Sequence, residues 1–184
     1  MTKTMSRREL LGTGTVTLGL VLVGCRRTSE GGDDTAGEVS PGEDLMREHG
    51  VLERLMVVYE TAAKRLDTGD RSAVSAVRDA ATIAHDFVEE YHERIEEQYV
   101  FPRFEHANHL VELVRVLRQQ HDAGRGLTNR ILELSQGPLT ADADRATLAA
   151  ALRGYVTMFT PHVGREDTVL FPAFHELVGK QYAE

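Results

Sequence analysis

Two histidine–glutamate pairs in this sequence have the spacing that places metal donors on one face of a helix. His92 is followed four residues later by Glu96, and His162 is followed four residues later by Glu166. Side chains at positions i and i+4 lie one above the other on an α-helix. Each pair therefore predicts one imidazole and one carboxylate directed into the same space, a mixture of donors that suits iron or manganese.

The two pairs belong to an internal repeat. Residues 92–104 and 162–174 share a histidine, a glutamate four positions later, a further acid, and a proline with phenylalanine just before it and two positions after it. Another histidine precedes each copy at a similar distance, His49 by 43 residues and His121 by 41 residues. One helix pair used twice would bring these groups together. The predicted metal ligands are His49, His92, Glu96, His121, His162 and Glu166.

Helices are the elements that must position these residues. Apolar residues recur with the helical period of 3.6, and no segment alternates with period two. The helices are predicted over residues 43–68, 72–101, 105–135 and 141–177. Pro102 is expected to end or kink the second helix, and Pro161 to kink or rearrange the fourth. The connections are short, which favours an all-α, antiparallel up-down-up-down four-helix bundle.

The first 25 residues are typical of an export signal. Paired arginines, Arg7 and Arg8, precede an apolar stretch of about a dozen residues, which is too short to span a bilayer as a helix. This order resembles a twin-arginine signal, and the stretch ends in Leu-Val-Gly-Cys, which resembles a lipobox with Cys25 as the lipidated residue. We expect residues 1–25 to be this signal, 26–42 to be a flexible tether, and 43–184 to be the bundle, held at a membrane of the cell envelope outside the cytoplasm.

Charge and cysteine content exclude several functions. The formal net charge is −8, so the chain has no excess of basic residues with which to neutralise nucleic-acid phosphates. It has one cysteine, which excludes an internal disulfide framework and a site built from several thiolates. The predicted metal site must therefore be built from histidine and carboxylate side chains.

The doubled histidine–glutamate motif with its Phe-Pro resembles the hemerythrin-like family, the HHE cation-binding domain, over roughly residues 43–177. The resemblance implies a non-haem di-iron centre that is bridged by two glutamates and capped by histidines. Carried onto this sequence, Glu96 and Glu166 match the bridging carboxylates, and His49, His92, His121 and His162 match the histidine ligands. Two iron ions are the expected cofactor, ahead of manganese or another divalent metal.

The sequence departs from the oxygen-carrying members of that family. They have a second histidine one turn after the third-helix ligand, where this chain has Arg125. They also end their last motif with an aspartate five residues after the histidine, a spacing that Asp167 would meet, although the repeat favours Glu166. The resemblance then implies an open coordination position, and it favours binding of O2, NO or a related small oxidant for sensing, storage or protection. A di-iron enzyme that reduces peroxide or nitric oxide, or an iron-handling protein, is the alternative, and the electron donor is unknown.

Residues around the predicted ligands have two interpretations each. His85 lies seven residues before His92 on the same helix face, and Tyr155 lies seven residues before His162. In one interpretation both residues surround the ligands or line an access route to them. In the other, both are ordinary packing residues. Glu97 and Asp167 are expected to lie outside the ligands or to face solvent.

Overall fold

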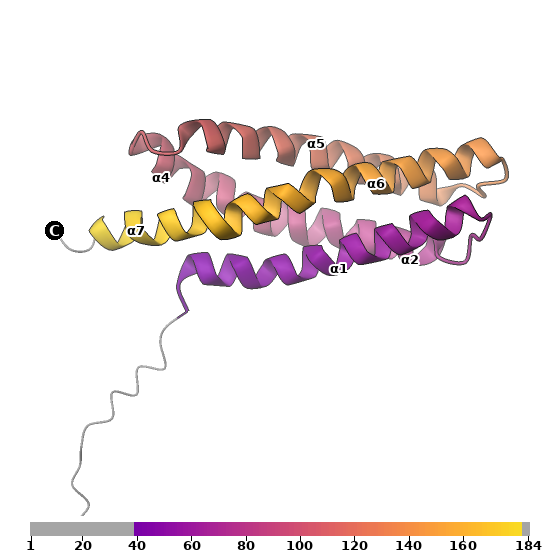
Figure 1. The fold of residues 1–184 in the computed structure, drawn as a ribbon, viewed down its shortest axis with the longest axis horizontal. Helices are drawn as coiled ribbons and strands as arrows, with labels where there is room; N and C mark the ends of the chain where they lie inside the picture. Colours follow the sequence, from indigo (N-terminus) through magenta and orange to yellow (C-terminus); the bar gives the residue numbers. More distant parts are fainter. Residues whose placement is uncertain (1–38, 182–184) are drawn as a thin grey trace, which may run out of the picture. The chain divides into compact units, whose positions relative to one another are not determined.

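The structure is a computed structural model, and it describes residues 39–181. Every regular element within that range is helical. The elements are α1 (Pro41–Asp67), α2 (Val74–Ile83), η1 (Ala84–His92), α3 (Glu93–Ile95), η2 (Glu96–Val100), α4 (Phe101–His106), α5 (Val111–Gln136), α6 (Asp142–Arg165), η3 (Glu166–Leu170) and α7 (Phe171–Gln181). The η segments are π-helical turns within longer helices, so these elements make four helical rods (Figure 1). The predicted all-α class is confirmed, whereas the predicted signal, Cys25 and most of the tether lie outside the described residues.

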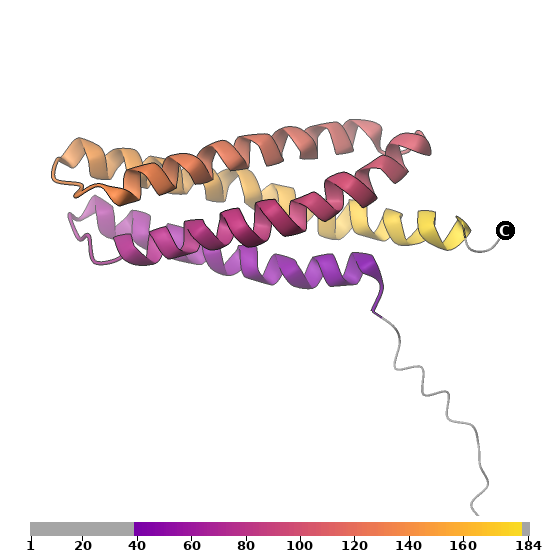
Figure 2. The same ribbon diagram turned by 180° about the vertical axis from the view of Figure 1, so that it is seen from behind.

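The four rods lie side by side as a bundle. In Figure 1 the rod from α6 to α7 lies between α1 and α5, and Figure 2 shows the rod from α2 to α4, in magenta, between α1 and α5 on the other side. Contacts at both ends of the rods indicate how the chain runs. Gly42, near the start of α1, packs on Phe171, whereas Asp67, at its end, pairs with Arg153 of α6. The start of α1 therefore lies beside the start of α7, and the end of α1 lies beside α6.

The start of α1 differs from the sequence prediction for a local reason. The helix begins at Pro41, so the last two residues of the predicted tether belong to the bundle. Ser40 is the N-cap, and its side chain accepts a hydrogen bond from the Glu43 amide at 3.3 Å. The Glu43 carboxylate in turn accepts one from the Ser40 amide at 2.9 Å, which completes a capping box with proline in the first turn.

Neither proline ends its rod. The second rod does not end at Pro102 but continues to His106, because proline is tolerated in the first turn of α4, directly after the π turn η2. The chain turns at residues 107–110, and the next helix therefore begins at Val111 rather than Glu105. In the fourth rod α6 passes through Pro161, and the rearrangement comes later, as the π turn η3.

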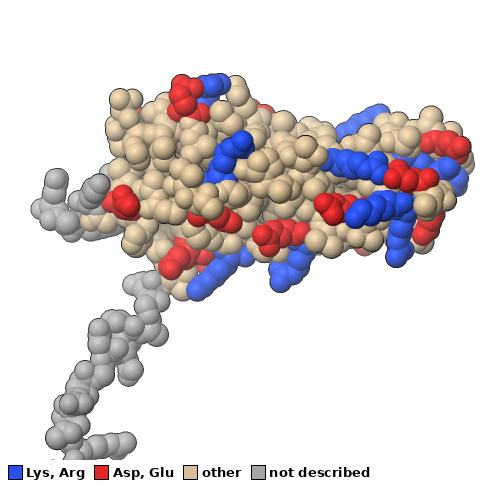
Figure 3. Space-filling view, viewed as in Figure 1, with Lys and Arg blue, Asp and Glu red and all other residues tan. Residues whose placement is uncertain are grey.

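Two apolar clusters fill the bundle, one at each side of the six predicted ligands. The larger cluster contains Tyr59, Tyr155 and Phe159 among its fully buried side chains. The smaller contains Phe101, Phe104, Phe171 and Phe174, the phenylalanines of the repeat. Within residues 39–181, no helix has the length and apolar character needed to cross a membrane. On the face in Figure 3, acidic and basic side chains are interspersed rather than separated by sign.

Gly124 lets α5 and α6 approach closely. A Cβ atom at this position would lie 2.6 Å from Cζ of the buried Phe159 and 2.8 Å from its Cε2. Gly124→Ala should therefore lower the free energy of unfolding by about 1–3 kcal/mol, the usual cost of overpacking a core. Gly126→Ala is the control, because that Cβ would meet nothing within 4 Å and alanine favours the helix. Thermal unfolding followed by circular dichroism measures both; equal melting temperatures for the two variants would contradict this packing.

Candidate metal centre

The six predicted ligands come together between the two apolar clusters, and we call them the His–Glu cluster. All six side chains are buried, and Glu96, His121 and Glu166 have no exposed surface. They form two groups whose donor atoms lie within 4.8 Å of one another. The groups are His49, His92 and Glu96 in one case, and His121, His162 and Glu166 in the other.

Each carboxylate also reaches one histidine of the other group. Glu166 Oε2 lies 3.1 Å from His162 Nε2 and 3.3 Å from His49 Nε2. Glu96 Oε1 lies 3.7 Å from His92 Nε2, and its Oε2 lies 3.4 Å from His121 Nε2. Two carboxylates between two pairs of imidazoles are positioned as groups that can be shared by two cations.

Nδ1 of every histidine in the cluster lies within hydrogen-bond distance of a side-chain oxygen. This contact fixes the ring so that Nε2 is directed toward the centre of the cluster. His49 Nδ1 lies 2.8 Å from Asp167, and His92 Nδ1 lies 2.8 Å from Glu48. His121 Nδ1 lies 2.9 Å from Glu97. His162 Nδ1 lies 3.1 Å from the side-chain oxygen of Gln120. When Nδ1 donates to these acceptors, Nε2 keeps its lone pair for the centre of the cluster, as metal-binding histidines require.

The acceptors follow a pattern that sequence analysis missed in part. Glu97 and Asp167, expected outside the ligands or facing solvent, lie outside the ligands and hold His121 and His49. Glu48 and Gln120 were not singled out, although each immediately precedes a cluster histidine. Each of these acceptors neighbours a cluster residue in sequence but serves a histidine on another rod. The sequence contains these acceptors as a repeated pattern: one directly precedes His49 and His121, and one directly follows Glu96 and Glu166.

The inner polar atoms lack partners in the protein. Both oxygens of Glu96 and of Glu166, together with Nε2 of His49 and of His121, are buried and have no hydrogen bond. Burying charged or polar groups without partners costs several kcal/mol. Burial raises the pKa of Glu96, and the charge of Glu166 raises it further. At Glu166 burial acts in the same direction, but the charges of the nearby His162 and His121 imidazoles outweigh it and lower the pKa.

The phenylalanine of each Phe-Pro packs on a histidine of the neighbouring copy. Phe101 stacks on His121 with ring centroids 5.4 Å apart, and Phe171 lies 5.6 Å from His49. Both phenylalanines follow the π turns η2 and η3, which begin at Glu96 and Glu166. Single π turns of this kind are frequent at functional sites. The repeated motif thus carries a ligand, a π turn and a packing residue together.

Arg125, which stands where an oxygen carrier has another histidine, turns away from the centre. Its guanidinium lies 3.0 Å from Glu93 Oε2 and 2.7 Å from Glu97 Oε1. The hydrogen bond from His121 and the charge of Arg125 hold the pKa of Glu97 at about 2, so Glu97 is an anion that can orient His121. Burial raises the pKa of the adjacent Glu93 to about 9.

The remaining two predicted residues lie apart from the ligands. His85 is 44 % exposed, and its Nδ1 contacts the neighbouring Asp86 at 2.7 Å. Tyr155 is fully buried in the larger apolar cluster and packs on Phe159, whose ring contacts His162. Among the described residues, no ring contact or hydrogen bond joins His85 to the His–Glu cluster.

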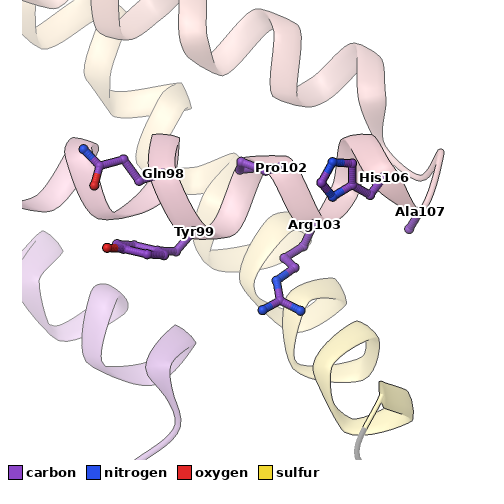
Figure 4. Close-up of a pocket in the computed structure, with 6 residues that line it drawn as sticks. All are labelled: Gln98, Tyr99, Pro102, Arg103, His106 and Ala107. Carbon is purple, nitrogen blue, oxygen red and sulfur yellow. The ribbon is translucent and has the colours of Figure 1, made fainter.

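A surface pocket of about 500 Å³ lies elsewhere, and Figure 4 shows its lining residues along one helix and the turn that follows it. The lining residues are Gln98, Tyr99, Pro102, Arg103, His106 and Ala107. None of them belongs to the His–Glu cluster. The candidate centre is therefore the buried cluster and not this pocket.

Comparisons with known proteins agree with this geometry. The sequence model of the family described as "Hemerythrin HHE cation binding domain" matches residues 40–174. Uncharacterized proteins of Mycobacterium bovis and of two strains of Mycobacterium tuberculosis are 40% identical to the chain over 184 residues, which covers 95% of this chain and 72% of each relative. No solved structure matches the chain.

The acceptors of Nδ1 should matter for metal binding. Glu48→Ala and Asp167→Ala each free one histidine ring to rotate, and we expect each to weaken metal binding by about 10–100-fold, as loss of such partners does at other metal sites. Glu53→Ala, an exposed position on α1, is the matched control and should leave the affinity unchanged. Titration of the metal-free protein with ferrous iron under anaerobic conditions measures the three affinities. Equal affinity in all three variants would show that the acceptors do not orient the ligands.

Proposed function

The chain belongs to the hemerythrin HHE cation-binding domain family, and we propose that it is a non-haem di-iron protein that binds O2, NO or a related small oxidant for sensing, storage or protection. The observation that carries this proposal is the set of six buried, inward-facing donors. Four imidazole nitrogens and two carboxylates converge there. Both carboxylates, together with Nε2 of His49 and of His121, have no hydrogen-bond partner. We further propose that the bundle is antiparallel, up-down-up-down, as the contacts at its ends suggest.

The donors fit two divalent cations. Imidazole nitrogen suits iron, and carboxylate oxygen suits harder ions such as manganese, so the mixture favours iron with manganese as the second choice. Two cations would offset the charge of Glu96 and Glu166, which the protein leaves without any hydrogen bond. His49 and His92 would hold one ion, and His121 and His162 the other.

The chain's own residues set the conditions for chemistry at the cluster. Bound iron supplies reversible binding or reduction of a small oxidant at a free coordination position. Six protein groups for two ions leave positions free, and Arg125 does not fill one because its guanidinium pairs with Glu93 and Glu97. The phenylalanine rings at His49, His121 and His162 keep water from the donors. Burial of this kind strengthens electrostatic interactions inside the cluster.

The predicted N-terminal signal indicates where in the cell this function would take place. We propose that the chain is exported through its twin-arginine signal and tethered by lipid at Cys25, so that the bundle lies at the cell envelope. A twin-arginine route carries folded proteins, which would let the bundle acquire its metal before export. A small diatomic or peroxide ligand would then reach the protein outside the cytoplasm.

The proposal predicts a specific response to small ligands. The full chain, loaded anaerobically with two ferrous ions, should change its optical absorption when O2 or NO is added and recover when the gas is removed. His121→Ala should abolish this response, whereas His85→Ala, at a partly exposed histidine outside the cluster, should retain it. Continuous consumption of hydrogen peroxide with a generic reductant would favour the redox enzyme instead. A loaded protein that responds to none of the three ligands would contradict both functions.

A further inference from the structure

A chain of aromatic rings leads from the His–Glu cluster into the bundle. The ring of His162 lies 5.2 Å from that of Phe159, and Phe159 lies 4.4 Å from Tyr155, centroid to centroid. Tyr155 lies 5.0 Å from Tyr59 in an edge-to-face contact. The two tyrosines come from α6 and α1, which lie side by side in Figure 1. Neighbouring rings are thus in contact from a predicted ligand to a pair of phenols.

Both phenols carry hydroxyl groups that the fold does not use. Tyr59 and Tyr155 have no exposed surface, and neither hydroxyl has a hydrogen-bond partner. A buried tyrosine whose hydroxyl has no partner is less stabilising than phenylalanine at the same position. The hydroxyl therefore needs another explanation, and a redox role is one. Burial raises the pKa of both phenols, and the charge of Glu89 raises that of Tyr59 further. Both rings are therefore protonated phenols at neutral pH.

Glu89 is a buried carboxylate whose charge acts on both phenols. Glu89 is buried on the second rod, and its Oε1 has no hydrogen-bond partner. Its carboxylate is close enough for its charge to raise the pKa of both Tyr59 and Tyr155. A phenol that loses an electron must also lose its proton, and Glu89 Oε1 is a free, buried base near it.

For each tyrosine, the other copy of the internal repeat has no tyrosine at the matching position. The position of Tyr155 corresponds to the exposed His85 in the other copy, and the position of Tyr59, ten residues after His49, corresponds to Ile131, ten residues after His121. The other two rings on cluster histidines are Phe101 and Phe171, and no ring contact leads from either to a tyrosine among the described residues. The route to phenols therefore exists on one side of the cluster only.

We propose that Tyr155 and Tyr59 form a redox-active pair that gives one electron to the cluster, through Phe159 and His162, when hydrogen peroxide oxidises it. This inference rests on the di-metal site of the proposed function. Peroxide takes up two electrons and two solvent protons as its O–O bond breaks, which gives two water molecules. With one ferrous and one ferric ion held by the cluster, the ferrous ion would supply one of these electrons. The other comes from the pair, where a phenolic O–H bond breaks, its proton passes to Glu89 Oε1, and a neutral phenoxyl radical remains.

The test is electron paramagnetic resonance on the full chain. Iron-loaded protein, its metal content measured beforehand, is brought to one ferrous and one ferric ion per chain, mixed with an equimolar amount of hydrogen peroxide and frozen at short times. The wild type should give a tyrosyl signal that narrows when the tyrosines are deuterated. Tyr59→Phe combined with Tyr155→Phe should abolish the signal, and Glu89→Gln should lower its yield because no carboxylate accepts the proton. Phenylalanine keeps each ring, so these variants should fold and load metal as the wild type does.

Exposed tyrosines supply the controls. Tyr99→Phe, at a ring that is 64% exposed, should leave the signal unchanged. Tyr91→Phe tests a competing route, because Tyr91 is near Glu48, the acceptor of His92. Loss of the signal in Tyr91→Phe, or its survival in the double variant, would overturn the proposal. A fully loaded wild type without a radical overturns this inference alone, whereas a chain that binds no iron pair overturns the proposed function together with it.

Discussion

The convergence of two buried carboxylates on four imidazoles is the interaction on which the rest of this structure depends. Glu96 and Glu166 have no exposed surface and no hydrogen bonds, although each lies within 4 Å of at least two histidine nitrogens. Such an arrangement is costly unless positive charge joins it. The acceptors of Nδ1, the packing phenylalanines and the two apolar clusters all serve to hold these donors in one place.

The way the rods are built follows from that convergence. In each copy of the repeat a π turn begins at the glutamate and is followed by Phe-Pro. The turn directs the glutamate inward, and the phenylalanine packs on a histidine of the neighbouring rod, Phe101 on His121 and Phe171 on His49. The acceptors cross between rods in the same manner. The bundle is thus tied together by the contacts that orient its candidate ligands, so ligand geometry and stability are coupled.

Much of the candidate centre could be predicted because its residues are duplicated. The i,i+4 pairs and the lone histidines gave six residues that the structure brings together. The π turns could not be predicted, because the apolar period of a π turn differs little from that of an α-helix over five residues. The sequence also did not indicate that the second rod continues through Pro102 to His106. The role of Glu48 was missed because only tertiary packing places it beside His92.

The contacts of Tyr155 are an example of features that the sequence could not predict. A helical stripe indicates that Tyr155 is buried, but it does not indicate that its hydroxyl lacks a partner or that its ring contacts Phe159. Those features depend on the neighbouring helix and on the close approach that Gly124 permits. The surroundings of the candidate ligands therefore depend on contacts between rods, which no single sequence motif contains.

Iron stoichiometry in matched glutamate variants tests the central claim most directly. The account predicts two iron ions per chain in the anaerobically reconstituted wild type and in Glu90→Ala, an exposed position on the same rod as Glu96. It predicts one ion or none in Glu96→Ala and in Glu166→Ala, because each variant removes a carboxylate that both ions would share. Two ions in either of the last two variants, or fewer than one in the wild type, would contradict the account.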